Sequence, residues 1–497
     1  MAADLGAGSG PRKAHESQAP TGRTLVSFLG EGHGNADSAI RFSHSLEGAC
    51  HDPPFRPPAP ALAACSSTTN YYGADPAVQS AAPVQQGQVA QGKAKNVILF
   101  VGDGMGISTI TAARILAGQQ QGQTGEENSL SFEKFDNVAL VKTYNTDAQV
   151  ADSAGTASAL NTGTKTRIGV INTAPDVPRG DCAAAQGHMM ETVAQEALDH
   201  GKAVGIISTA RLTHATPAAV YGHNPDRNWE SDADMPAPQQ ALGCTDFAQQ
   251  LVDFPFDLAL GGGSRKFLGT GEGGERKDAG ANLPAEWAAR TGGTFVADTQ
   301  AMRKAPLDRP VLGLFSPSHM TYQLDRKPDT SEPTLTEMTA EALRRLSDDP
   351  SGYYLMVEGG RIDHGHHAGK AGYALEETIE FARAIQYAVD NTDPDETLIL
   401  VTADHSHVFT IAGYPRRGND ILGLVVPPEG GGEDGDTGDG PTLAADGKPY
   451  TTLGYGTGPG AIKPDAEGGR PMPETGVRAH QQAAIPTGSE THGGEDV

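Results

Sequence analysis

Three short apolar runs, each followed by small and acidic residues, constrain this chain most strongly. They cover residues 96–101, 353–357 and 398–402. Runs of this length are typical of buried parallel strands, whose polar ends meet at one edge of a sheet. Apolar residues at helical spacing continue through Ile115 and recur over residues 372–390. We therefore predict an α/β fold with a doubly wound, mostly parallel sheet flanked by helices.

Composition narrows the function classes. The 497 residues include 62 acidic and 37 basic side chains, a formal charge of -25. This charge repels nucleic acids and anionic membrane surfaces, so we expect neither as a stable partner. No apolar run approaches the ~18 to 20 residues of a membrane-spanning helix.

The chain divides by composition into four segments. We expect residues 1–93 to be a disordered, signal or linker segment, because they show no helical or strand period. Residues 94–410 should form the catalytic α/β domain. Residues 411–480 are rich in Gly, Pro and Asp and predict an insertion, after which residues 481–497 return to the domain.

A short motif in the first segment bears on export. Leu62-Ala63-Ala64-Cys65 has the form of a bacterial lipoprotein cleavage box. A signal peptide also needs 7 to 15 apolar residues before the cut, and that stretch is rich in proline here. Two interpretations stay open: a chance match, or a periplasmic or secreted protein with a lipid anchor at Cys65.

The four cysteines, Cys50, Cys65, Cys182 and Cys244, form no Cys-x-x-Cys pair. Any zinc must therefore be held by histidine and carboxylate. Their spacing leaves open whether Cys182 and Cys244 form a disulfide or are two unrelated thiols.

The predicted strand ends carry metal-ligand residue types, namely Asp103 after the first, Glu358, Asp363 and His367 after the second, and Asp404 and His405 after the third. Mixed histidine and carboxylate groups suit Zn²⁺, and all-oxygen groups suit Mg²⁺. Asp363 and His367 are four residues apart, on one face of a helical turn. Asp404 and His405 could share a metal only if the strand end curls, because neighbours on a strand face opposite ways.

Asp152-Ser153 precedes a run of small residues and offers a nucleophile at the start of a helix. A helix N-terminus favours an alkoxide and a phosphate. The alternative is that Ser153 is an ordinary helix N-cap. Arg227 could grip two phosphate oxygens with its planar fork, although an arginine in a loop is weak evidence by itself.

Six motifs in order resemble those of the alkaline phosphatase family, over residues 95–497. They are Gly102-Asp103-Gly104-Met105-Gly106, Asp152-Ser153-Ala154, His214-Ala215-Thr216-Pro217-Ala218-Ala219, Val357-Glu358-Gly359, Thr402-Ala403-Asp404-His405 and Glu490-Thr491-His492. Their order over four hundred residues is far more specific than any single motif.

The resemblance implies a set of roles for these residues. Two zinc ions and one magnesium ion per chain are expected, and Ser153 would form a phosphoserine by double displacement. The implied first zinc site is Asp363, His367 and His492, the second is Asp103, Asp404 and His405, and the magnesium site is Asp103, Thr216 and Glu358. Arg227 would hold the phosphate, with Asp152, His214 and His364 as supporting or phosphate-contacting residues.

Histidine at both positions 214 and 364 resembles the animal-type members, in which magnesium binds loosely, so added Mg²⁺ should raise activity. The resemblance also implies a bridge between Cys182 and Cys244. It makes residues 411–480 a crown-like insertion, and hence implies a homodimer. Family members continue past the final histidine motif with an apolar segment, whereas His492 lies five residues before Val497. We expect a frayed tail to weaken the first zinc site.

Three alternatives accompany hydrolysis of small-molecule phosphate monoesters. A metal-dependent phosphodiesterase of the same superfamily is not excluded by the sequence. A sulfatase needs Cys-x-Pro-x-Arg or Ser-x-Pro-x-Arg after an apolar strand, and none is present. The third alternative is an inactive surface protein that binds phosphate or metal.

Overall fold

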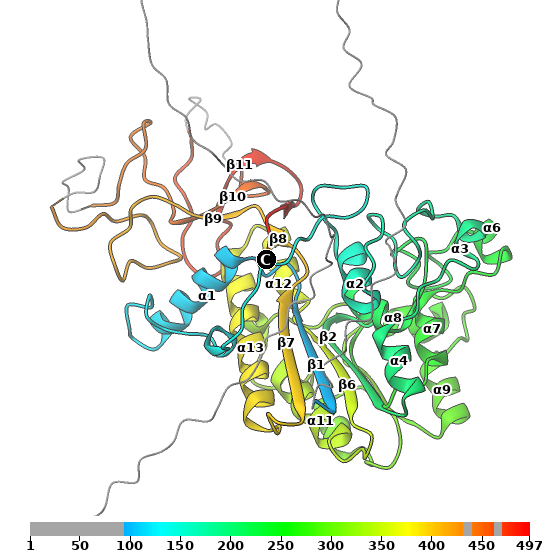
Figure 1. Cartoon of the computed structure of the whole chain (residues 1–497). Helices are drawn as coiled ribbons and strands as arrows, with labels where there is room; N and C mark the ends of the chain where they lie inside the picture. The colour runs from blue at the N-terminus through cyan, green and yellow to red at the C-terminus, as the bar shows by residue number, and fades with distance from the viewer. Residues whose placement is uncertain (1–93, 431–439, 462–469) are drawn as a thin grey trace, which may run out of the picture. The chain divides into compact units, whose positions relative to one another are not determined.

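A seven-stranded sheet forms the centre of the computed structural model, which describes residues 94–430, 440–461 and 470–497. The strand order is β4-β5-β3-β2-β6-β1-β7, and every neighbouring pair is parallel (Figure 1). The strands are β1 (Asn96–Gly102), β2 (Ala203–Arg211), β3 (Leu258–Gly262), β4 (Thr294–Val296), β5 (Val311–Leu314), β6 (Tyr353–Glu358) and β7 (Thr397–Ala403). The predicted α/β fold is confirmed. The predictions for residues 1–93, including Cys50 and Cys65, lie outside the described residues.

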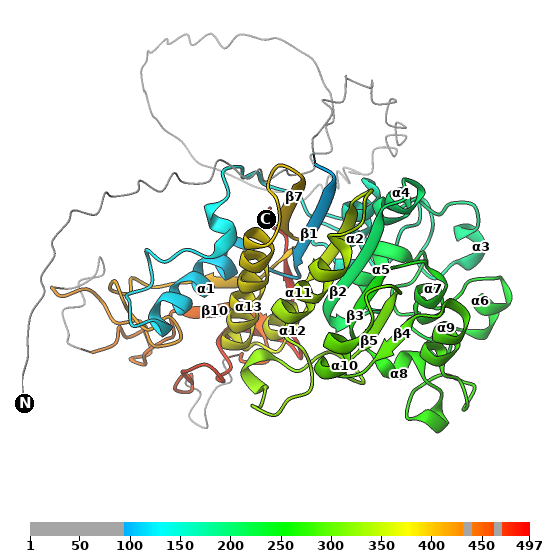
Figure 2. The same ribbon diagram turned by 90° about the horizontal axis from the view of Figure 1, so that it is seen from below.

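Helices cover both faces of this sheet (Figure 2). The α-helices are α1 (Ile107–Gln120), α2 (Ser153–Thr162), α3 (Cys182–Ala185), α4 (Val193–Asp199), α5 (Ala215–Tyr221), α6 (Ala237–Ala241), α7 (Phe247–Asp253), α8 (Ser264–Phe267), α9 (Leu283–Thr291), α10 (Thr299–Lys304), α11 (Leu335–Leu346), α12 (Arg361–His367) and α13 (Ala371–Asp390). Three 3₁₀ helices are η1 (Ser131–Lys134), η2 (Thr270–Glu272) and η3 (Gln323–Asp325).

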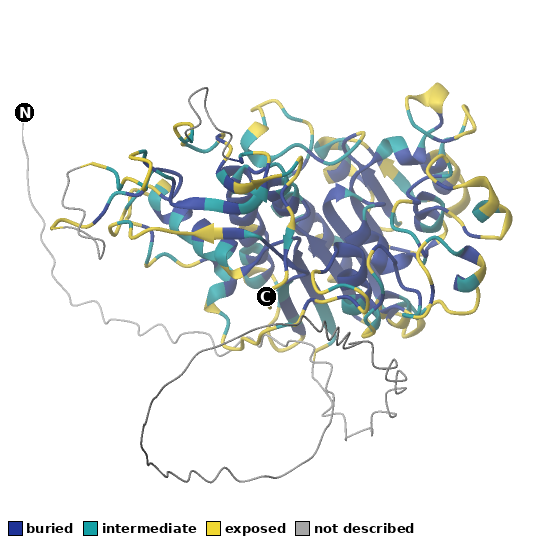
Figure 3. Cartoon of the chain, turned by 90° about the horizontal axis from the view of Figure 1, so that it is seen from above, coloured by how far each residue is buried: buried dark blue, intermediate teal, exposed yellow. Residues whose placement is uncertain are grey.

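Alternation along β1 explains the two layers. Ile98 and Phe100 join the cluster that contains α1, α11 and α13, whereas Leu99 and Val101 join the cluster that contains α4, α5, α7 and α9. A strand buried on both faces is apolar throughout, as the sequence of β1 is. Figure 3 shows the buried residues concentrated along the sheet and the inner helix faces.

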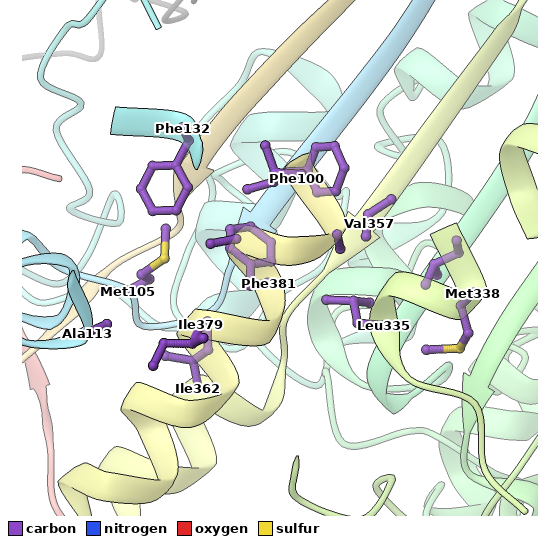
Figure 4. Packing of buried hydrophobic residues seen from close by; sticks show 14 of the residues in the cluster. Phe100, Met105, Ala113, Phe132, Leu335, Met338, Val357, Ile362, Ile379 and Phe381 are labelled. Carbon is purple, nitrogen blue, oxygen red and sulfur yellow. The ribbon is translucent and has the colours of Figure 1, made fainter. Parts of the chain in front are cut away.

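Phe381 of α13 fixes this helix against the sheet (Figure 4). Its ring meets Phe100 edge-on at 5.9 Å between centroids and Phe132 at 6.3 Å. The side chain is fully buried. Truncation of such a phenylalanine costs about 3–5 kcal/mol. The position of α12, which immediately precedes α13, depends on this packing.

Two smaller sheets lie at the C-terminal ends of the central strands. One has the order β11-β10-β9, formed by β9 (Phe409–Ile411), β10 (Leu453–Gly458) and β11 (Gln482–Pro486). The other pairs β8 (Ser406–His407) with β12 (His492–Gly493). Residues 431–439 and 462–469 of the expected insertion lie outside the described residues, so the domain boundaries stay a prediction.

The last residues are held firmly, and the expectation of a frayed tail is wrong. His492 pairs with His407 in the ladder of β8 and β12. Val141 and Val497 exchange both backbone hydrogen bonds, at 2.9 and 3.2 Å. Sequence position suggested fraying, but backbone pairing decides whether a terminus is ordered.

Along the described ranges, none of the helices is both long enough and apolar enough to cross a membrane.

Candidate active site with metal centres

The first cluster comprises Asp363, His367 and His492. Asp363 Oδ1 lies 3.2 Å from His367 Nε2 and 3.4 Å from His492 Nε2, and the two Nε2 atoms are 3.1 Å apart. Each histidine donates its Nδ1 hydrogen to a backbone carbonyl, that of Glu490 or Ala151, at 2.7 Å. With the ring hydrogens on Nδ1, the two Nε2 atoms turn lone pairs toward each other, an arrangement that suits a shared metal and not a hydrogen bond.

His407 belongs to this site, although the sequence prediction missed it. Its Nε2 donates to Asp363 Oδ1 at 3.0 Å, and its Nδ1 donates to Glu490. Burial alone lowers the pKa of His407, but the two carboxylates outweigh burial and raise it to about 9. His407 is thus a buried cation that orients Asp363. The sequence feature that could have identified His407 is its position two residues after His405.

The second cluster comprises Asp103, Asp404 and His405. His405 Nε2 lies 3.4 Å from Asp103 Oδ1 and 3.5 Å from Asp404 Oδ2. Asp404 follows the end of β7, and its Oδ1 accepts from the backbone N–H groups of Gly104 and His405. The chain leaves the strand there, so adjacent side chains meet, as the sequence analysis required.

Gly104 makes this approach possible. Its φ is +67°, and a Cβ there would lie 2.3 Å from His407 Nε2. Only glycine adopts this backbone conformation readily and leaves the necessary space.

Ser153 lies at the second cluster. Its Oγ is 3.1 Å from His405 Nε2 and 3.4 Å from Asp103 Oδ1. The N-cap of α2 is Asp152, whose carboxylate accepts from the N–H of Gly155 at 3.1 Å. The alternative that Ser153 is itself the cap is therefore wrong. Its hydroxyl is the first polar group of α2 that faces the clustered ligands.

Arg227 is anchored beside Ser153. Its Nη1 donates to Asp152 Oδ2 at 3.0 Å, and its Nη2 lies 3.3 Å from His214 Nε2. Asn145, another residue missed from the sequence, donates to Asp152 Oδ1 at 2.9 Å. Burial opposes ionisation of Asp152, yet the charge of Arg227 and these hydrogen bonds hold its pKa below the usual value. The Arg227 guanidinium is thereby held in one orientation.

The third cluster comprises Asp103, Thr216 and Glu358. Asp103 Oδ2, Thr216 Oγ1 and Glu358 Oε1 are buried and have no hydrogen-bond partner among the described residues. Glu358 Oε2 accepts from Ser208. Unpartnered buried oxygens need an explanation, and an all-oxygen set fits Mg²⁺. His214 could offer a nitrogen to the same space.

The clustered carboxylates repel one another. Burial, followed by the charges of Asp404, Asp363 and Glu358, raises the pKa of Asp103 well above its usual value. Burial raises the pKa of Glu358 to about 7 and that of Asp404 to about 6. Bound cations would relieve this repulsion.

A disulfide joins Cys182 to Cys244, as the family resemblance implied. Both sulfurs belong to a small buried cluster with Trp229 and Met235. Trp229 lies two residues after Arg227, so the bridge stabilises the loop that carries the arginine.

The structure thus brings together all the predicted ligands, Ser153 and Arg227. His364 lies at the edge of the site, with its ring 5.4 Å from that of His214. The sequence analysis assigned no role to four further residues of the site. They hydrogen-bond the side chains of predicted site residues or of each other, and they are His407, Glu490, Asn145 and Ser208.

Known proteins resemble the chain closely. A family model described as alkaline phosphatase matches residues 94–497. The tissue-nonspecific alkaline phosphatase of Gallus gallus is 45% identical over 428 residues, which cover 82% of this chain and 79% of that protein. The corresponding human isozyme is 42% identical, covering 81% and 78%. An alkaline phosphatase of Gadus morhua is 43% identical, covering 82% and 86%.

Solved structures agree in fold. The Thermus thermophilus alkaline phosphatase superposes with a TM-score of 0.55 at 29% identity, over 66% of this chain and 63% of that one, which is less than two thirds of its length. The enzyme from the Antarctic bacterium TAB5 has a TM-score of 0.52 at 25% identity, covering 72% and 89%.

Proposed function

The chain belongs to the alkaline phosphatase family, and from this premise we propose that it hydrolyses small-molecule phosphate monoesters through a phosphoserine on Ser153. The observation that carries the proposal is the position of Ser153 Oγ, within 3.4 Å of ligand atoms from Asp103 and His405. A serine without a metal or base nearby would be a weak nucleophile at neutral pH.

Arg227 and the start of α2 would hold the substrate phosphate. The guanidinium, braced by Asp152, offers two N–H donors to phosphoryl oxygens. Ser153 Oγ–H loses its proton to solvent and Oγ attacks phosphorus, so that a new O–P bond forms as the ester O–P bond breaks. The departing alkoxide takes a proton from solvent and leaves as the alcohol. Water cleaves the phosphoserine in the second displacement, so two inversions give overall retention at phosphorus.

The donor sets fit two zinc ions and one magnesium ion. The first cluster would hold one zinc and the second cluster the other, and the third cluster would hold magnesium, with Asp103 shared. When bound, zinc acts as a Lewis acid that stabilises the anionic attacking and leaving oxygens. His407, Asn145 and Ser208 orient the ligands and the arginine.

Ser153→Ala provides the central test. We expect the variant to lose monoesterase activity by about a thousandfold or more, because covalent catalysis fails. Elemental analysis of the parent should give two zinc and one magnesium per chain. A parent that binds two zinc ions but hydrolyses no monoester would indicate the inactive binding protein. A faster rate on bis-nitrophenyl phosphate than on nitrophenyl phosphate would favour the phosphodiesterase.

Added Mg²⁺ should raise the rate of dialysed enzyme. This expectation rests on His214 beside the third cluster and on His364 near it. A nitrogen donor makes the site less favourable for a hard cation than a third carboxylate would. An unchanged rate after Mg²⁺ addition would contradict it.

We also propose a periplasmic or secreted homodimer in which residues 411–480 form a crown-like insertion. The Cys182–Cys244 disulfide supports an oxidising compartment. A lipid anchor at Cys65 is one form of this proposal. Light scattering tests the dimer, and Cys65→Ser tests the anchor through loss of membrane association.

A further inference from the structure

Three histidine rings extend the site beyond Arg227. Arg227 Nη2 lies 3.3 Å from His214 Nε2. The ring centroids of His319 and His364 are each 5.4 Å from that of His214, and they are 4.0 Å from each other. We call these three residues the imidazole cluster. Within this cluster, His214 is the residue that contacts Arg227, the proposed phosphate ligand.

Each ring of the imidazole cluster has a buried nitrogen without a partner. The Nδ1 atoms of His214, His319 and His364 make no hydrogen bond to any described residue. All three residues are nonetheless half-buried and not fully enclosed. Three unpartnered polar atoms in one place indicate a bound polar group.

His319 offers a hydrogen-bond donor there. Its Nε2 accepts from Arg211 Nη1 at 2.6 Å, because a guanidinium can only donate. Arg211 is held by Glu230, with Nε 2.6 Å from Oε2. Burial, followed by the neighbouring histidines and arginines, lowers the pKa of His319. Because Nε2 accepts a hydrogen bond, the ring hydrogen of His319 is on Nδ1.

Arg361 brings a charge without a direct counterion. Its guanidinium stacks on the Tyr322 ring, 3.5 Å from the centroid. Among the described residues it makes no side-chain hydrogen bond and no ion pair within 4.0 Å, and its buried Nε has no partner. It is close to the imidazole cluster, because Arg361 and His364 are three residues apart on α12 and therefore lie on one face of this helix.

The guanidinium of Arg361, which has no direct counterion among the described residues, and the Nδ1 hydrogen of His319 are donors that favour an anion. We propose that Arg361 and the imidazole cluster form a subsite for a second anionic group, phosphate or carboxylate, on the substrate whose phosphate is held at Arg227. The inference rests on the proposed function. His214 Nε2 lies 3.3 Å from Arg227 Nη2, and its ring is 5.4 Å from those of His319 and His364, so a short aliphatic linker would span the two anionic groups.

Three substrates with the same propane-1,3-diyl linker test the subsite: 3-hydroxypropyl phosphate, 3-carboxypropyl phosphate and propane-1,3-diyl bisphosphate. Their leaving alkoxides are alike, so kcat/KM reports the distal group. We expect at least one anionic substrate to exceed the hydroxyl substrate by about tenfold, the effect of one charge-assisted contact. The larger of the two anionic preferences identifies the group as phosphate or carboxylate. Equal rates on all three would overturn the inference.

In Arg361→Gln, kcat/KM for the anionic substrate should fall to about that for 3-hydroxypropyl phosphate, so that the preference is lost. The value for 3-hydroxypropyl phosphate itself should stay within about twofold of the parent. His319→Asn should reduce the preference partly. Arg309→Gln is the matched control, since it removes one positive charge from an exposed arginine whose ion-pair partner among the described residues is Asp308. It should retain the full preference.

Two outcomes would show that a loss of preference has a cause other than the subsite. Equal loss of preference in Arg309→Gln would indicate general electrostatics and refute the subsite. Loss of zinc and of the hydroxyl substrate's rate in Arg361→Gln would make Arg361 structural and refute it too. If the zinc-loaded parent fails on the hydroxyl substrate, the proposed function itself fails. Hydrolysis without preference refutes the subsite alone.

Discussion

In the first cluster, backbone carbonyls hold both histidines and His407 balances Asp363. In the third cluster, three buried oxygens have no hydrogen-bond partner within the part of the chain that the structure describes. Burial alone would raise the pKa of Asp363, but the surrounding histidines lower it well below its usual value. The pKa of Glu358 is instead raised to about 7. In the first cluster, protein groups therefore orient the proposed ligands, and the surrounding histidines balance the charge of Asp363. In the third cluster, a bound cation would be needed to balance the charges of the carboxylates.

The largest expected contrast is between ligand losses in the two clusters. His492→Ala leaves two ligands and an open side in the first cluster, so kcat/KM should fall by more than the ~100-fold that losing a supporting partner costs. Thr216→Val keeps both carboxylates of the third cluster. Its smaller loss should be restored by excess Mg²⁺. Rates with elemental analysis test this, and equal losses at saturating Mg²⁺ would break the comparison.

Replacing one carboxylate by an amide should change the free energy of unfolding of the metal-free protein in opposite directions in the first and third clusters. At pH 8, Asp363→Asn should lower the free energy of unfolding by about 3–5 kcal/mol, because it breaks a buried ionic contact with His407. Glu358→Gln should raise it by roughly 1–3 kcal/mol, because the ionised form of a group with a raised pKa destabilises the fold. Urea denaturation with a chelator measures both. Destabilisation by both variants would contradict the contrast.

Glu377 is a matched control outside the three clusters. Burial also raises its pKa to about 7, and its carboxylate accepts from the N–H of Gln323 at 2.6 Å. Since the folded pKa lies above the usual glutamate pKa of 4.5, ionisation costs stability progressively between pH 4.5 and 7. Glu377→Gln should therefore stabilise the protein by roughly 1–3 kcal/mol at pH 8 and by almost nothing at pH 4.5. Metal content should not change, unlike in Glu358→Gln.

Asn145→Ala should have the smallest effect. The variant removes one hydrogen bond to Asp152 and loosens Arg227, which costs about 1 kcal/mol. We expect KM for a monoester to rise about fivefold, with little change in zinc content. Asn145→Asp, which opposes the Asp152 carboxylate, should be worse than alanine. Unchanged KM in both variants would mean that Arg227 is oriented without Asn145.

The predictable part of the site lies next to the strands. Asp103, Glu358 and Asp404 follow apolar runs, so sheet geometry alone brings them to one edge. His407 and Asn145 escaped prediction because their function is to hydrogen-bond another side chain, and no local pattern marks such a contact. His492 was identified by resemblance, yet its firm placement depends on a two-residue ladder that the sequence does not signal.

The sequence by itself determined the parallel sheet, the metal-ligand residue types at its strand ends and the family, because apolar periodicity and the order of motifs can be read along the unfolded chain. Only the tertiary structure decided that Asp152 and not Ser153 caps α2, that the tail is paired, and that one cluster is balanced while another is not. Those outcomes depend on which distant groups share a hydrogen bond or a buried charge. Such pairings exist only after the chain has folded.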